Sequence, residues 1–215
     1  QGGDMLARGV DSKGRLQIRY SDNHAMKAAA NKFGRVTELR AKRQQIIHEV
    51  DKDALSVEKK ENAECLRLIL SLGIRPGSDT DTGADKKAYG ATTLEGRHVV
   101  VQGNEVRLRF VGKKGVDLDL PVADPRCAEI LRRRSAAAGL TGRLFRTDAT
   151  RLRDYSKSKD GGGFKTKDHR TALGSETALR SVRAMPRPKT VKEYKAAIKE
   201  VSTIVSQVLG NTPAI

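Results

Sequence analysis

The chain has 215 residues, enough for one domain with a substantial core. Lysine and arginine number 42 against 26 aspartates and glutamates, which gives a formal net charge of +16 at pH 7. Such an excess of positive charge repels itself in a compact chain, so a polyanion is the expected partner and nucleic acid the first candidate. We find no apolar run of transmembrane length, no signal peptide and no amphipathic helix with a bulky apolar face, which argues against a membrane protein.

Aromatic residues make up only 4% of the chain, and tryptophan is absent. Proteins that bind single strands stack bases on aromatic side chains, so duplex DNA is the better-supported target. The two cysteines, Cys65 and Cys127, are too few for a disulfide framework or a zinc site. Their number is typical of a protein from a reducing compartment.

The first part of the chain predicts one strand followed by helices. Polar and apolar residues alternate over 15–20, directly after a turn-forming segment at 11–14. Residues 23–50 are rich in Ala, Lys, Arg and Gln and contain no proline, which predicts one or two basic helices. A further helix is expected to begin near Ser56 and to end at Gly73.

The rest of the chain predicts a small antiparallel sheet between helices. Turn residues at 103–104 and 112–115 separate short runs of β-forming residues, so a meander is expected at about 92–122. Its strand-like runs are 92–94, 98–101, 106–111 and 117–122. Four helices are expected after it, namely 126–138, 149–157, 171–184 and 190–209. The predicted fold class is mainly α with a small antiparallel β-meander.

Standard enzyme motifs are absent from the sequence. There is no phosphate-binding loop, no Gly-x-Ser-x-Gly elbow, no His-Glu-x-x-His motif and no acidic cluster suited to two magnesium ions. Chemistry on phosphates would therefore depend on cations, because fixed guanidinium groups stabilise charge on nonbridging oxygens. The candidates are Arg75 at a helix end, Lys113 in a tight turn and Arg170 at a helix start. Any one of them taken alone is more often a solvated surface charge.

Six stretches, in order along the chain, resemble type IB DNA topoisomerases of the poxvirus and bacterial kind, which are relatives of the tyrosine recombinases. They are Gly9–Gln17, Leu72–Ser78, Tyr89–Leu94 with Arg97-His98, Arg109–Lys113, Lys167–Thr171 and Leu209–Pro213. The resemblance covers nearly the whole chain and implies the fold of the catalytic domain that breaks and rejoins DNA. It also implies double-stranded DNA as partner, a monomeric clamp, and no metal or nucleotide cofactor. The implied location is the bacterial cytoplasm, at the nucleoid, or a virus.

In this family a tyrosine attacks a DNA phosphodiester, forms a 3′-phosphotyrosyl link and frees a 5′-hydroxyl end, which is rejoined without ATP or metal. The resemblance implies that Arg75 and Arg170 clamp the nonbridging oxygens of the transition state and that Lys113 protonates the leaving oxygen. Lys167 takes a weaker supporting role. Asn211 stands where poxvirus members have histidine, and its amide can still donate a hydrogen bond to a phosphate oxygen.

The first residues resemble the end of the family's N-terminal β domain. The resemblance implies DNA contacts from Lys13, Arg15, Gln17 and Tyr20. Ile18 replaces an aromatic residue, which favours general rather than site-specific binding, because specificity needs contacts to base edges. Residues 1–20 are therefore expected to be the last strand of that domain with a linker, and residues 21–215 to be the catalytic domain.

The family's nucleophilic tyrosine follows shortly after the Gly-Asn-Thr-Pro motif, whereas this sequence stops at Ile215. Amphipathic core or rim positions suit the four tyrosines that are present better than catalysis does. These are Tyr20, Tyr89, Tyr155 and Tyr194. We therefore expect a fragment that is truncated before the nucleophile and that binds DNA without cleaving it.

Other interpretations stay open on the sequence. A tyrosine recombinase or integrase shares the arginines and the lysine turn, although the stretches at 11–13 and 89–94 favour a topoisomerase. A non-catalytic basic DNA-binding protein would bind in a salt-sensitive way without breaking strands. A generic basic domain, such as a ribosomal one, explains the charge but not the six ordered stretches.

Overall fold

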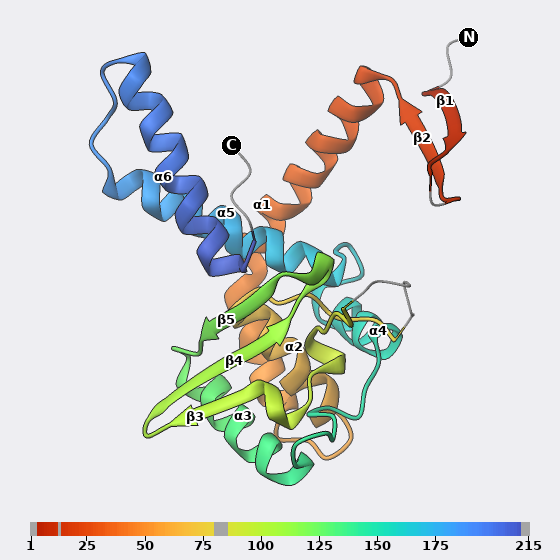
Figure 1. Cartoon of the computed structure of the whole chain (residues 1–215), viewed down its shortest axis with the longest axis vertical. Helices are drawn as coiled ribbons and strands as arrows, with labels where there is room; N and C mark the ends of the chain where they lie inside the picture. Colours follow the sequence, from red (N-terminus) through yellow and green to blue (C-terminus); the bar gives the residue numbers. More distant parts are fainter. Residues whose placement is uncertain (1–3, 13, 80–85, 212–215) are drawn as a thin grey trace.

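The computed structural model describes residues 4–12, 14–79 and 86–211 (Figure 1). The predicted fold class, mainly helical with a small antiparallel sheet, is confirmed. The helices are α1 (Asp22–Asp53), α2 (Lys60–Leu72), α3 (Pro125–Ala138), α4 (Ala149–Asp160), α5 (Thr166–Ala184) and α6 (Val191–Leu209). The strands are β1 (Met5–Val10), β2 (Leu16–Tyr20), β3 (Val99–Gln102), β4 (Glu105–Val111) and β5 (Asp117–Pro121). Short 3-10 turns are η1 (Ala91–Thr93), η2 (Gly96–His98) and η3 (Lys113–Gly115).

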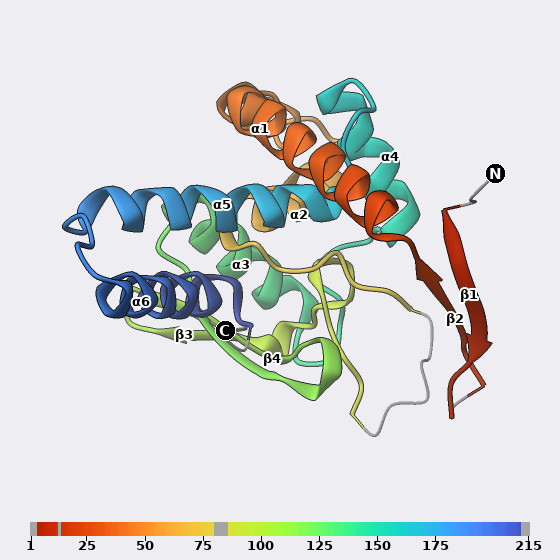
Figure 2. The same ribbon diagram turned by 90° about the horizontal axis from the view of Figure 1, so that it is seen from above.

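Helix α2 forms the centre of the core. Every residue from Ala63 to Leu70 is buried, because α1, α3, α4 and α5 all pack against this helix. The helix ends at Gly73, whose φ of +62° gives the left-handed cap that glycine adopts without steric cost. Helix α5 lies between α1 and α6 and contacts both of them (Figure 2).

Strands β3, β4 and β5 form the predicted antiparallel meander, with Val99 opposite Leu108 and Phe110 opposite Leu118. Alternate residues of β4 are buried, and the sheet packs on α3. The prediction of a strand at 92–94 was wrong. Thr92 and Thr93 belong to η1 instead, because the Thr92 N–H bonds to the Pro76 carbonyl (2.8 Å) rather than to a neighbouring strand. The meander therefore runs over 99–121.

Several other features differ from the predictions, among them the start of α2 at Lys60 rather than near Ser56 and the end of α4 at Asp160 rather than at 157. The basic segment forms one continuous helix, α1, capped by the Ser21 side chain. The predicted strand at 15–20 has a partner, because β1 pairs with β2 in an antiparallel hairpin. Helix α5 begins at Thr166 rather than at 171, because the Asp168 carboxylate accepts the Lys165 N–H (3.0 Å) and caps the first turn.

Two parts of the chain project from the body (Figure 1). One is the first half of α1 with the β1–β2 hairpin, whose strand residues are all exposed. The other consists of the outer parts of α5 and α6. Within the described ranges, no helix combines the length and apolar character that crossing a membrane requires.

Candidate active site

A cavity of about 340 Å³ lies where the β4–β5 turn meets the ends of α2 and α6 and the start of α5. It is lined by Arg75, Tyr89, Phe110, Gly112, Lys113, Lys114, Val116, Leu118, Arg170, Gly210 and Asn211. Four of the five predicted catalytic residues are therefore brought together from distant parts of the sequence. The fifth, Lys167, is exposed in the first turn of α5 and is not part of this lining.

Arg170 is the fixed cation of the cavity. Its guanidinium donates to the carbonyls of Gly73 and Leu209 (2.7 Å for Leu209) and to Oδ1 of Asn211 (2.7 Å). Those two carbonyls lie at the C-terminal ends of α2 and α6, where the helix dipoles are negative and stabilise a cation. Burial, and then the positive charge of Arg75, lower the pKa of Arg170 to about 10, so it stays charged at neutral pH.

Arg75 is exposed and follows the cap of α2, and its backbone is held by η1. The Arg75 carbonyl accepts the Ala91 N–H at 2.8 Å. Gly90 makes this approach possible, because a Cβ there would lie only 2.7 Å from the Arg75 carbonyl oxygen. The stretch at 89–94 therefore does not contribute a side-chain cation but fixes the loop that carries one.

Lys113 lies in the turn between β4 and β5, which the Gly112 N–H closes by bonding to the Val116 carbonyl (2.7 Å). Its neighbour Lys114 also lines the cavity and adopts a left-handed backbone, with φ of +67°. Lys114 was not among the residues predicted from the sequence, although its position beside Lys113 in the Gly-Lys-Lys-Gly turn was a usable signal. Among the described residues, the lining holds four cations and no carboxylate, so the cavity suits an anion.

Tyr89 is half-buried and also lines the cavity, which sequence reasoning did not anticipate. Its hydroxyl accepts a hydrogen bond from Arg97 (2.9 Å), and its ring packs edge-on against His98, with 4.4 Å between centroids. The other tyrosines lie outside the lining. Tyr155 donates to Asp53 (2.9 Å), and burial together with this carboxylate raises its pKa.

Three of the predicted DNA-contacting residues, Arg15, Gln17 and Tyr20, lie on the β1–β2 hairpin and are not part of the cavity lining. The side chains of Arg15 and Gln17 both donate to Asp11, at 2.8 Å and 2.9 Å. Tyr20 stacks on His24, with 4.4 Å between ring centroids. Lys13 lies outside the described residues.

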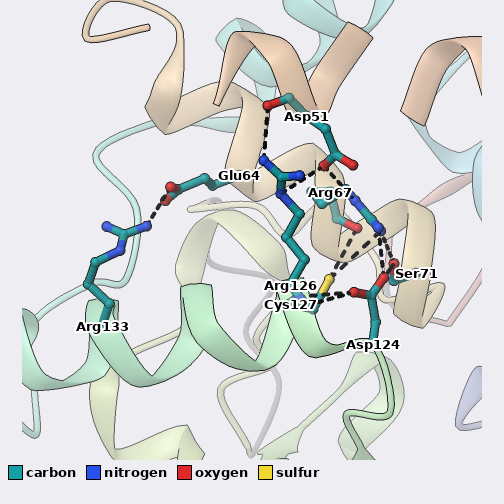
Figure 3. Close-up of polar contacts among 8 residues, drawn as sticks. All are labelled: Asp51, Glu64, Arg67, Ser71, Asp124, Arg126, Cys127 and Arg133. Carbon is teal, nitrogen blue, oxygen red and sulfur yellow. Dashed lines mark hydrogen bonds and ion pairs between the residues drawn. The ribbon is translucent and has the colours of Figure 1, made fainter. Parts of the chain in front are cut away.

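A network of ion pairs fixes α2 against its neighbours (Figure 3). Arg67 pairs with Asp51 of α1 (2.9 Å) and with Asp124 at the start of α3 (2.8 Å), while Ser71 donates to Asp124 (2.7 Å). Burial opposes ionisation of Asp124, but the Ser71 bond and the Arg67 charge outweigh it and lower its pKa. The network holds rigid the helix that ends at Gly73 and leads into Arg75. No pattern in the sequence predicted this network.

The family model described as "Eukaryotic DNA topoisomerase I, catalytic core" matches residues 21–215. The chain belongs to this family. It is a topoisomerase I catalytic core of type IB, as the six ordered stretches indicated, and the cavity lies within this core.

A curated relative gives the same assignment. The DNA topoisomerase 1B of Acanthamoeba polyphaga mimivirus is 24% identical to this topoisomerase core over 222 aligned residues. The alignment covers 92% of this chain and 63% of the relative. The chain therefore spans less than two thirds of the length of the relative that it matches.

Proposed function

We propose that this chain binds duplex DNA as a monomer and holds one phosphodiester in the cavity. In a chain that includes the nucleophile, the bound strand is broken through a 3′-phosphotyrosyl link and rejoined, which relaxes supercoils without ATP or metal. The observation that supports this best is the lining itself, in which Arg75, Lys113, Arg170 and the Asn211 amide meet with no carboxylate among the described lining residues. The mimivirus relative, a DNA topoisomerase 1B, agrees with this proposal.

The arginines suit a phosphoryl-transfer transition state, in which charge grows on the nonbridging oxygens. Three of the five guanidinium N–H donors of Arg170 are bonded to described residues, and the other two, which bond to none of these, are available to a phosphate. Because Oδ1 of Asn211 accepts from Arg170, its Nδ2 is left as a donor to a second oxygen. Exposed Arg75 completes the clamp.

Lys113 is proposed as the general acid that protonates the leaving 5′-oxygen. A turn closed by backbone hydrogen bonds gives an ammonium group a defined position, and an exposed lysine at its tip can reach a bound backbone. Lys167, one helical turn before Arg170, is proposed to bind the same phosphate from outside the cavity lining. Lys13, Arg15, Gln17 and Tyr20 are proposed to contact the duplex away from the cavity.

The nucleophile is proposed to come from outside the four tyrosines at positions 20, 89, 155 and 194. Only Tyr89 lines the cavity, and its hydroxyl is occupied by Arg97. Residues 1–215 should therefore retain a nicked suicide duplex without forming a covalent adduct. An adduct mapped to Tyr89 by mass spectrometry would overturn this part of the proposal.

The reaction is tested with a chain that carries the nucleophile. Supercoiled plasmid should be relaxed in a chelating buffer without ATP, and a variant with Lys113→Ala should be slow. A duplex with a 5′-bridging sulfur, which leaves without protonation, should restore cleavage by that variant. A strict magnesium requirement, or no rescue by the sulfur substrate, would contradict the proposed chemistry.

A further inference from the structure

The outer parts of α5 and α6, residues 178–205, form a helical hairpin that we call the arm. No residue of the arm is buried, and it projects from the body (Figure 1). It carries seven basic residues against two carboxylates, Glu193 and Glu200. The basic residues are Arg180, Arg183, Arg187, Lys189, Lys192, Lys195 and Lys199. None of the seven is ion-paired within the described part of the chain.

The lysines of α6 gather on one side of the helix. Lys192, Lys195 and Lys199 follow an i, i+3, i+7 spacing, which gives them a shared face. Val201 falls on the opposite face and Val205 on the flank between the two faces, and both are half-buried. Val205 lies against α5, because a Cβ built on Gly174 would meet its side chain at 3.5 Å. All three lysines are exposed, so their shared face is open to solvent along the arm.

The base of the arm lies beside the cavity. Arg170 of α5 donates to the Leu209 carbonyl at the end of α6, so both helices meet the cavity at the base of the arm. The 19 residues of α6 extend about 28 Å at the helical rise of 1.5 Å per residue. Along a duplex this length corresponds to about eight base pairs.

We propose that the arm binds backbone phosphates of the duplex seated in the cavity, at positions up to about eight base pairs from the bound phosphodiester. The inference rests on the proposed function, because the cavity must hold DNA for the arm to lie alongside it. An anionic lipid surface is the competing partner, since Val182 and Val191 are exposed on the arm. DNA is the favoured partner, because the arm begins at the cavity and a single duplex can therefore contact both.

The test compares two variants that lose the same charge. The arm variant carries Lys192→Gln, Lys195→Gln and Lys199→Gln. The control carries Lys52→Gln, Arg146→Gln and Lys157→Gln, three exposed cations outside the arm that form no ion pair among the described residues. Affinity for a 30-base-pair duplex, measured by fluorescence anisotropy over a salt series, should fall about tenfold or more in the arm variant. The slope of log K against log salt should also become shallower by about two to three.

A short hairpin duplex of about four base pairs provides the second comparison, because a duplex seated in the cavity then ends before it reaches the three lysines of the arm. Wild type and arm variant should bind it almost equally. Equal losses in the arm variant and the control on the long duplex would overturn the arm proposal alone. So would loss of binding to phosphatidylserine vesicles with DNA binding intact. Failure of the wild type to bind either duplex would instead overturn the proposed function.

Discussion

Arg170 is a buried cation whose described partners are backbone carbonyls and an amide rather than a carboxylate. A carboxylate partner would neutralise the guanidinium and compete with phosphate for its donors. The carbonyls at the ends of α2 and α6 orient the group while leaving its full charge available to a ligand. The carbonyls therefore hold the Arg170 side chain in place, and its charge remains available to bind an anion.

Replacing Arg170 should separate binding from chemistry in a chain that carries the nucleophile. Arg170→Ala should lower single-turnover cleavage of a suicide duplex by about 10²- to 10³-fold, with a much smaller effect on duplex affinity. Arg170→Lys should not restore the rate, because an ammonium group lacks the planar fork that spans two carbonyls and a phosphate. Arg132→Ala is the control, since Arg132 also donates to a carbonyl, that of Asn104 (2.6 Å), outside the cavity lining. Parallel losses of rate and affinity in Arg170→Ala would contradict the assignment.

At the level of elements, the position of the cavity depends on α2. Its C-terminal end supplies the Gly73 carbonyl and leads into Arg75, while its middle is fixed by the pairs that Arg67 makes with Asp51 and Asp124. Helix α5 adds a second connection, because Ser156 of α4 contacts Nε2 of the buried His169 (3.0 Å). Small shifts of these helices would therefore move the two arginines relative to each other.

Asp124→Asn tests the contribution of the network around α2. Asp124 caps α3 by accepting the N–H groups of Arg126 and Cys127, and it is also the partner of Arg67. We expect a loss of about 2 kcal/mol in the free energy of unfolding, measured by urea denaturation, because Arg67 keeps a mostly buried charge with one partner fewer. Asp148→Asn is the matched control, because Asp148 caps α4 in the same way but its ion partner Arg151 is exposed. Equal losses in both variants would mean that only capping matters.

At the level of the whole molecule, the free energy of unfolding should depend on pH through His169. Burial, and then the charge of Arg43, lower its pKa from 6.5 to about 4. The unfolded chain therefore binds the proton more readily between these values, so stability should fall as pH drops from about 6.5 to about 4, by up to about 3 kcal/mol. His169→Asn should flatten this part of the profile in urea titrations, whereas exposed His48→Asn should leave it unchanged. A profile that stays steep in His169→Asn would assign the dependence to other groups.

Most elements of the molecule could be predicted from the sequence, because helix caps and turn glycines mark their ends. The errors have local causes. Thr92 and Thr93 have β propensity, but contacts with Pro76 and Gly90 fold them into η1. The start of α5 depends on a cap by Asp168, which no apolar period reveals. The ordered stretches named four residues that line the cavity and one, Lys167, that does not. The bonds from Arg170 to distant carbonyls, and the position of Tyr89, depend on tertiary packing.

The bonds of Arg170 also determine when the cavity can exist. One guanidinium joins the ends of α2 and α6 to the start of α5, segments that lie about a hundred and about forty residues away from it in the sequence. None of these contacts is local, so no part of the chain assembles the anion site before the others have reached their final arrangement. A newly made or partly unfolded molecule therefore lacks the complete anion site.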